Sequence, residues 1–292
     1  MIYAVSHRTT VEYAGIVRLA QFILRLRPGA WPTQTVSDFE LEIDPAPALR
    51  REETGPFGLA ETRIAITQPI ARLSILSRFR VEVSPPAFDT DSEEGPSLTQ
   101  LRKAALAMPD LSATGPAGFL FASPIAGVEP EIGDWAREWL TGDRPILAAG
   151  AALMSAIHDQ FRYDAAATRA DTPTIDAFRA RHGVCQDFAH VMISAARAHG
   201  LPAAYVSGYL RTLPPPGQER LVGADAMHAW AALWCGEALG WVGFDPTNDC
   251  IAGTDHIVIG MGRDYADVAP VDGVILASGG QHIDVVVSVV PC

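Results

Sequence analysis

Lysine is almost absent from this sequence: Lys103 is the only one, and arginine supplies the rest of the basic charge. Acidic residues outnumber basic ones, and the formal net charge is −12. Nucleic acids and anionic membrane surfaces are bound through basic patches on a protein. The composition therefore argues against both classes of partner.

Long hydrophobic runs are also missing. No stretch approaches the roughly 18 apolar residues that a membrane-spanning helix needs, and the opening MIYAVSHRTTVEYAG has neither the apolar core nor the cleavage site of a signal peptide. We therefore expect no membrane span and a cytoplasmic location. The cysteines form no CxxC pair, and in a cytoplasmic protein they are expected to be free thiols. They are Cys185, Cys235, Cys250 and Cys292.

The residues that are present describe a globular protein. Hydrophobic residues make up 48% and charged residues 19% of 292 positions, which is enough to bury a sizeable core. Residues 1–85 alternate apolar and polar positions, most clearly in FELEID and FRVEV, and predict an N-terminal β domain. Residues 86–145 begin with the acidic AFDTDSEEGPSL and predict a linker that leads into a partly helical segment.

From residue 146 onwards, helical patterns precede extended ones. The helical patterns end at FRYD, ARHG and AHGLP, and the extended stretches include AAYVSGYL, MHAWAALWC and GWVGFDPTND. Three further strand candidates lie between these stretches and the C-terminus. We therefore expect residues 146–292 to form an α+β domain, with helices packed on an antiparallel sheet, that includes the C-terminal strands.

The stretch RHGVCQDFAH holds a cysteine where a glycine opens onto one of these helices. Cys185 has three interpretations: a nucleophile, a metal ligand, or a buried structural residue, since free cysteine is among the most buried residue types. Its place at a helix N-terminus favours the nucleophile, because the helix dipole and the unpaired N–H groups stabilise a thiolate there. That position alone does not decide between the first and the third interpretation.

A helical projection tests the metal interpretation. At 100° per residue, Asp187 and His190 project to the side of the helix opposite Cys185. They fall there with Ser194 and Arg197, on what the projection predicts to be a polar face. No second cluster of cysteine and histidine has the spacing of metal ligands. We therefore expect no metal at this cysteine.

A nucleophilic thiol needs a base, and the sequence offers one on a hairpin. If GEAL is the loop between MHAWAALWC and GWVGFDPTND, Cys235 pairs with Gly240. This register puts Asp245 opposite Trp230 and diagonal to His228, on one face of the sheet. A shift by one residue would break the arrangement. Cys185, His228 and Asp245 are thus candidates for nucleophile, base and orienting carboxylate.

The stretches HGVCQDFAH, DAMHAW and GWVGFDPTND resemble the transglutaminase-like superfamily of papain-type cysteine enzymes. FRYD, YVSGYL, FDPTN and GRDYADVAPVDGV resemble further blocks of the bacterial transglutaminase-like proteins, and HRTTVEY resembles the start of their N-terminal β domain. The resemblance covers nearly the whole chain, most weakly between residues 86 and 145. One departure is Met227, where such proteins often carry a small polar residue before the histidine.

The resemblance implies a papain/transglutaminase-like core with a Cys-His-Asp triad formed by Cys185, His228 and Asp245. It implies acyl-enzyme chemistry on an amide bond, with no cofactor and no metal. The oxyanion would be held by the backbone N–H of Cys185 and by one side-chain donor, for which Tyr163 is the candidate. It leaves the oligomeric state open.

Three functions remain after this comparison. We expect a peptidase or amidase that acts on a peptide or isopeptide substrate. The first alternative is transfer to an amine, as by a protein-glutamine gamma-glutamyltransferase, and the second is a peptide-binding module without catalysis. A peptide or protein substrate is the expected partner, and family association adds peptide-ligase-type proteins.

Overall fold

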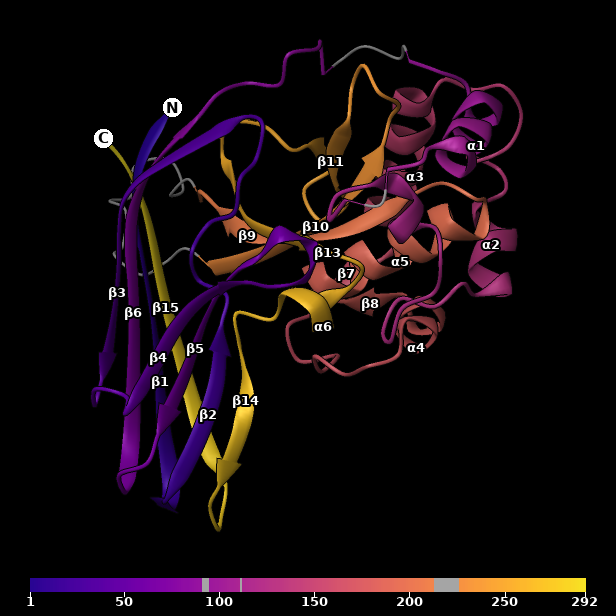
Figure 1. The fold of residues 1–292 in the computed structure, drawn as a ribbon. Coiled ribbons are helices and arrows are strands. Elements are labelled where there is room, and N and C mark those ends of the chain that lie inside the picture. The colour runs from indigo at the N-terminus through magenta and orange to yellow at the C-terminus, as the bar shows by residue number, and fades with distance from the viewer. Residues whose placement is uncertain (91–94, 111, 213–225) are drawn as a thin grey trace, which may run out of the picture.

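The computed structural model describes residues 1–90, 95–110, 112–212 and 226–292. It contains a β-sandwich and an α+β unit whose sheet lies between the sandwich and the helices (Figure 1). The α+β fold class is confirmed. Within the described residues, no helix is long and apolar enough to cross a membrane.

The sandwich consists of two four-stranded antiparallel sheets, β15-β1-β6-β3 and β14-β2-β5-β4. Side chains of alternating strand positions fill the space between them, with Leu73 and Ile75 fully buried. The strands of the first sheet are β1 (Ile2–Val17), β3 (Gln34–Asp44), β6 (Ile70–Val83) and β15 (Gln281–Pro291), and those of the second are β2 (Leu19–Leu24), β4 (Leu49–Thr54), β5 (Ala60–Ile66) and β14 (Val271–Leu276).

The C-terminal strands correct one expectation. We expected residues 146–292 to keep these strands with the α+β unit, but β15 pairs along β1 and β14 pairs along β2. The chain thus returns to the N-terminal sheets after the α+β unit is complete. Alternation predicts that a segment is a strand, but it does not predict the strand with which that segment pairs.

The α+β unit is built on an antiparallel sheet in the order β12-β11-β10-β9-β13. Its strands are β9 (Ala203–Leu210), β10 (Ala226–Trp234), β11 (Trp241–Asp245), β12 (Cys250–Ile251) and β13 (His256–Gly262). Helix α5 (Cys185–Ala198) packs on β9 and β10 and is buried over most of its length. Helices α3 (Ile146–Gln160), α4 (Thr174–Ala180) and α2 (Pro130–Ala136) surround α5 in one apolar core.

The segment expected to be a linker with some helix joins this core. It forms α1 (Leu98–Ala107), whose first turn carries a capping box between Ser97 and Gln100, and then α2. Leu98, Leu101 and Ile132 are buried in the same apolar cluster as α5. Residues 95–145 thus contribute to the helical layer and do not merely connect two domains.

The sandwich and the α+β sheet share a third apolar cluster, in which Phe79 and Val81 of β6 meet Tyr209 of β9. The Tyr209 hydroxyl also hydrogen-bonds His7 Nδ1 of β1 at 2.7 Å. Met227, the departure from the family pattern, packs against this cluster. Its apolar side chain therefore serves the contact between the two units.

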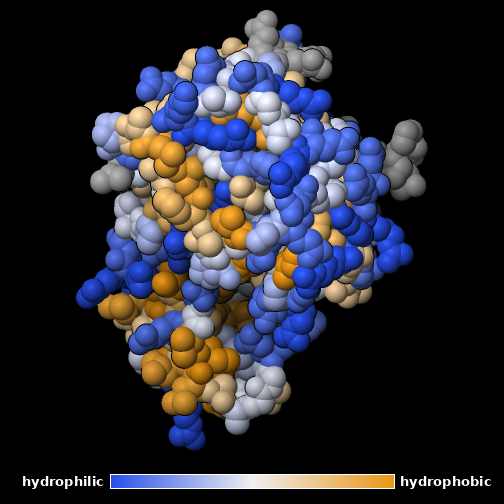
Figure 2. Space-filling model, turned by 90° about the vertical axis from the view of Figure 1, so that its right-hand side faces the viewer, coloured by the Kyte–Doolittle hydropathy of each residue, from blue (hydrophilic) through white to orange (hydrophobic). Residues whose placement is uncertain are grey.

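Some apolar side chains stay exposed on the sandwich. Figure 2 shows hydrophobic residues gathered in the lower part of the molecule, where Figure 1 places β14. Val274 and Leu276 of β14 are among the most exposed large hydrophobic residues described. Exposed polar and charged side chains cover most of the helical face in the same view.

Candidate active site

Cys185 is the first residue of α5 and is half-buried. The helix can begin there because Asp187 accepts a hydrogen bond from the Val184 N–H at 2.8 Å and another from the Thr168 hydroxyl at 2.6 Å. Gly183 leaves room for that carboxylate, since a Cβ at this position would lie 2.5 Å from Asp187 Oδ2. The local sequence thus places the thiol at the helix N-terminus, where the dipole stabilises negative charge.

The hairpin that carries His228 and Asp245 has the predicted register. Ala231 pairs with Phe244 and Trp234 with Trp241, and the Cys235 N–H donates to the Gly240 carbonyl at 2.8 Å. Continuing this register by one pair places Asp245 opposite Trp230. Across the hairpin, His228 Nε2 lies 2.7 Å from Asp245 Oδ2. The predicted diagonal contact is confirmed.

His228 also interacts with Cys185. Its side chain is 9% exposed, its ring hydrogen-bonds Asp245, and the Cys185 side chain is close enough to act on its pKa. Burial acts to lower the pKa of His228, but the bonds to Asp245 and Cys185 and their negative charges outweigh it and raise the pKa to about 10. Since Nε2 is engaged by Asp245, Nδ1 is the nitrogen that remains for the thiol. The structure therefore brings all three predicted residues together.

The Asp245 carboxylate is fully buried and accepts several hydrogen bonds. Oδ1 accepts from the backbone N–H groups of Thr247 at 3.0 Å and Asn248 at 3.3 Å. Oδ2 accepts from His228, from Asn248 Nδ2 at 2.7 Å and from His256 Nε2 at 3.1 Å. Burial alone would raise the pKa of Asp245, yet these donors and the charge of His228 hold it well below its usual range.

An indole packs against both imidazole rings at this carboxylate. The Trp230 ring centroid lies 5.9 Å from that of His228 and 5.1 Å from that of His256. Two glycines on the neighbouring strands make room for the indole, because a Cβ at Gly208 would lie 2.6 Å from one ring carbon and a Cβ at Gly243 would lie 2.9 Å from Nε1. Trp230 thus holds the imidazole rings of His228 and His256 in place.

Tyr163, the oxyanion candidate, lies next to the start of α5. The short strand β7 (Arg162–Tyr163) pairs in parallel with β8 (His182–Gly183), which sets Tyr163 beside Gly183. The Tyr163 residue is 55% exposed, and its pKa is raised first by burial and then by negative charge on Cys185. Tyr163 is therefore within electrostatic reach of the thiol. The role of its hydroxyl in holding an oxyanion stays a prediction.

The sequence analysis missed a second tyrosine near the thiol. Tyr205 of β9 is buried, and its ring centroid lies 4.9 Å from that of His190. Burial and then the charge of Cys185 raise its pKa well above the usual value. It lies in the apolar run AAYVSGYL, and nothing in that run distinguishes it from a core residue.

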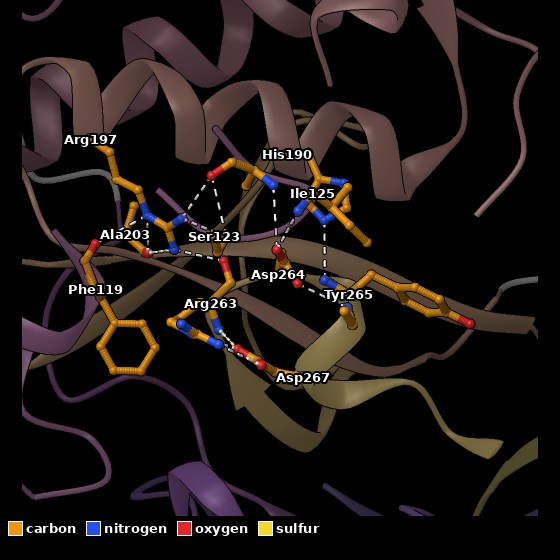
Figure 3. A network of polar contacts seen from close by, with 12 residues as sticks. Phe119, Ser123, Ile125, His190, Arg197, Ala203, Arg263, Asp264, Tyr265 and Asp267 are labelled. Atoms are coloured by element: carbon orange, nitrogen blue, oxygen red, sulfur yellow. Dashed lines mark hydrogen bonds and ion pairs between the residues drawn. The ribbon is translucent and has the colours of Figure 1, made fainter. Parts of the chain in front are cut away.

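The predicted polar face of α5 is not a solvent-exposed face. Asp187, His190, Ser194 and Arg197 are each no more than 3% exposed. His190 Nε2 accepts a hydrogen bond from the Tyr265 N–H at 3.2 Å, while Asp264 accepts one from the Ile125 N–H at 2.7 Å (Figure 3). These partners come from distant segments that cover the helix, which a helical projection does not reveal.

Arg197 is held in the same network by backbone carbonyl groups. Its guanidinium donates to the carbonyl oxygens of Arg263 at 2.6 Å and Ala203 at 2.8 Å, and to Ser123 Oγ at 3.0 Å (Figure 3). Burial lowers the pKa of Arg197 to about 10, against the nearby negative charge of Asp264. The network is thus satisfied by internal partners and fixes α5 against its surroundings.

Three of the site's side chains also offer atoms of the kind that bind metal ions. One ligand atom each from His228, Asp245 and His256 lie within 4.8 Å of one another. This group differs from the one around Cys185 that the sequence analysis weighed, and it includes a residue that analysis did not single out. In the structure these atoms are hydrogen-bonded to one another around Asp245 Oδ2.

Besides Tyr205, the sequence analysis did not identify His256 and Asn248 as site residues. Asn248 lies in the FDPTN block and His256 opens the apolar strand HIVIG. A histidine immediately before a buried strand is a usable signal. Its approach to Asp245 depends, however, on how residues 252–255 cross the end of the sheet between β12 and β13.

Comparisons with known proteins identify the family and the fold. Residues 133–246 match the model of the transglutaminase-like superfamily, and residues 3–82 match that of the bacterial transglutaminase-like N-terminal region. An uncharacterized protein of Mycobacterium tuberculosis is 40% identical over 298 aligned residues, which cover 99% of this chain and 92% of the relative. An uncharacterized protein of Mycobacterium bovis matches to the same extent.

Two further comparisons concern named activities. A protein-glutamine gamma-glutamyltransferase of Pseudomonas aeruginosa is 36% identical over 107 residues, which cover 36% of this chain and 16% of that protein. A solved structure from Cytophaga hutchinsonii, provisionally described as a cysteine protease, superposes with a TM-score of 0.74 at 22% identity and covers 98% of this chain and 90% of its own. The second comparison supports the fold over the whole chain.

Proposed function

Because this chain belongs to the transglutaminase-like superfamily, we propose that it is a cysteine-dependent amide-bond enzyme with Cys185 as nucleophile, His228 as acid and base, and Asp245 as the orienting carboxylate. The observation that carries the proposal is the 2.7 Å contact of His228 with a fully buried Asp245, in an imidazole whose pKa the Cys185 side chain also raises. A pKa of about 10 for His228 keeps this imidazole protonated at neutral pH. A protonated imidazole beside the thiol stabilises the thiolate.

In the first half of the reaction, the Cys185 thiolate attacks the carbonyl carbon of an amide. A C–S bond forms and the carbonyl electron pair moves to oxygen, where the Cys185 backbone N–H and the Tyr163 hydroxyl would donate hydrogen bonds. As the C–N bond breaks, His228 gives its proton to the departing nitrogen. The products are an amine or ammonia and a thioester on Cys185.

In the second half, neutral His228 takes a proton from the acceptor, whose lone pair attacks the thioester carbon. The C–S bond breaks, the thiolate leaves, and imidazolium is restored. Water as acceptor gives a carboxylic acid, which is the reaction of a peptidase or amidase. We propose hydrolysis of a peptide or isopeptide substrate as the principal reaction.

Amine transfer is the second candidate. The similarity to the gamma-glutamyltransferase of Pseudomonas aeruginosa covers 36% of this chain and supports amine transfer. In that reaction a primary amine replaces water at the same thioester. The two functions share every residue named above and differ in the acceptor alone.

The experiment is a screen of glutamine-containing peptides with and without a primary amine. Hydrolysis predicts a new carboxylic acid in both arms without incorporation of the amine: peptide fragments where a peptide or isopeptide bond is cleaved, and ammonia where the glutamine side-chain amide is cleaved. Transfer predicts incorporation of the amine in the second arm. Cys185→Ala should abolish turnover in both arms while the circular dichroism spectrum is retained. Turnover by the folded Cys185→Ala variant at the wild-type rate would contradict the proposal.

A further inference from the structure

His256 reaches the active-site carboxylate from a strand at the far edge of the sheet. His256 is the first residue of β13, and Asp245 is the last residue of β11. In the order β11-β10-β9-β13, two strands lie between them. The Trp230 indole, which packs against His256, has room because Gly208 of β9 carries no side chain. The ring arrives with Nε2 at 3.1 Å from Asp245 Oδ2.

The tautomer of His256 follows from its second partner. Its Nδ1 lies 3.2 Å from the backbone nitrogen of Gly253, whose N–H donates to it. A ring nitrogen that accepts a hydrogen bond carries no proton. Nε2 therefore bears the hydrogen in the neutral ring and donates it to Asp245, so the short Gly253–His256 turn fixes both the tautomer and the direction of the bond.

We propose that His256 is a positioning residue, which holds Asp245 Oδ2 where His228 requires it and so extends the active-site group beyond its three central residues. This inference rests on the proposed function. Oδ1 is bound by two backbone N–H groups that move with the Asp245 turn itself, at Thr247 and Asn248. His256 alone among the donors to Asp245 comes from β13 and ties the carboxylate to another part of the sheet.

The surroundings of His256 suit this role. Its side chain is 6% exposed and its edge packs against Trp230, the indole that also contacts His228. One side of His256 lines a cavity of about 200 Å³ between the sandwich and the α+β sheet. The other described lining residues include Trp31, Phe88 and Trp241 and no charged side chain. No competing ionic group therefore faces His256 from this cavity.

The test compares variants of His256 by the rate at which iodoacetamide alkylates Cys185. His256→Phe keeps a flat ring but removes the donor, and it should slow alkylation by about tenfold or more, because small misplacements of catalytic groups have effects of this size. His256→Gln keeps an N–H near the position of Nε2 and should restore most of the rate. His282→Phe, on the exposed part of β15, is the matched control and should leave the rate unchanged.

Chemical rescue separates hydrogen bonding from volume. His256→Gly opens the position onto the cavity, so added imidazole should accelerate alkylation of Cys185 at a pH of about 8, where free imidazole is mainly neutral. 1-Methylimidazole has nearly the same shape but no N–H and should not. The downfield proton resonance of the His228–Asp245 bond should broaden or shift in His256→Phe and persist in His256→Gln.

Two results would overturn the role of His256: wild-type alkylation rates in the folded Phe variant, or equal rescue of the Gly variant by imidazole and 1-methylimidazole. Both leave the proposed function intact, provided that wild-type Cys185 reacts faster than Cys292. If wild-type Cys185 shows no such preference, the proposed function itself fails.

Discussion

Histidine shows how strongly the surroundings of a residue decide its chemistry in this protein. Within the described residues, buried His7 and His190 form hydrogen bonds with no carboxylate, and burial lowers the pKa of each to about 4, in His190 against the charge of nearby Asp264. His228 is similarly buried, yet Asp245 and Cys185 raise its pKa to about 10. At neutral pH the same side chain is therefore neutral as a structural group and cationic in the candidate active site.

His7 gives a prediction about stability and pH. Its folded-state pKa of about 4 lies below the unfolded value of 6.5, so its contribution is fully present above pH 6.5 and is lost as the pH falls towards 4. The shift corresponds to about 3 kcal/mol. Between pH 7 and pH 4, His7→Gln should therefore lose about 3 kcal/mol less unfolding free energy than the wild type, as measured by urea denaturation.

The control for this prediction is His282→Gln, because His282 is exposed. It should show the same pH dependence as the wild type. If His7→Gln also follows the wild-type curve, burial of a neutral His7 is not a source of the acid sensitivity.

At the scale of elements, the sequence predicts contacts that depend only on the length of a loop and on the alternation of side chains along a strand. The hairpin of β10 and β11 was predictable because a four-residue loop and a period of two fix which residues share a face. These two features are enough to predict that His228 and Asp245 lie together. The burial of His190 and Arg197 was not predictable, since the segments that cover α5 lie near residues 119–126 and 263–267.

The contact of His256 with Asp245 was likewise not predictable from the sequence. Its strand was predictable from HIVIG, but its bond to Asp245 requires the crossing of the chain from β12 to β13. Sequence reasoning therefore identified the groups within one hairpin and one helix. It could not identify a group that depends on the order of strands in the sheet.

At the scale of the whole molecule, the two ends of the chain fold together. β15 supplies a full neighbour to β1, and β14 supplies one to β2, although more than 200 residues separate them in sequence. Arg25, the residue after β2, forms a buried ion pair with Glu61 at 2.9 Å and also donates to the Ala269 carbonyl just before β14. The N-terminal residues thus depend on the C-terminal ones for both sheets.

This dependence predicts the behaviour of fragments. Residues 1–85 alone should not give a cooperative thermal transition, because each sheet lacks one strand and β1 and β2 become open edges. The same residues joined to residues 271–292 by a flexible linker of about 20 residues should show one. A cooperative transition of equal midpoint in both fragments would show that β14 and β15 are dispensable.

The central claim concerns Cys185, and its relative reactivity tests that claim most directly. Burial raises the pKa of Cys235 and raises that of Cys250 to about 11, while Cys292 is exposed and serves as the internal reference. Iodoacetamide rates at each cysteine are measured by mass spectrometry between about pH 6 and 7, where an ordinary thiol is mostly protonated. We predict that Cys185 reacts about tenfold or more faster than Cys292 and that His228→Ala removes the difference. Equal rates at Cys185 and Cys292 in the wild type would contradict the account.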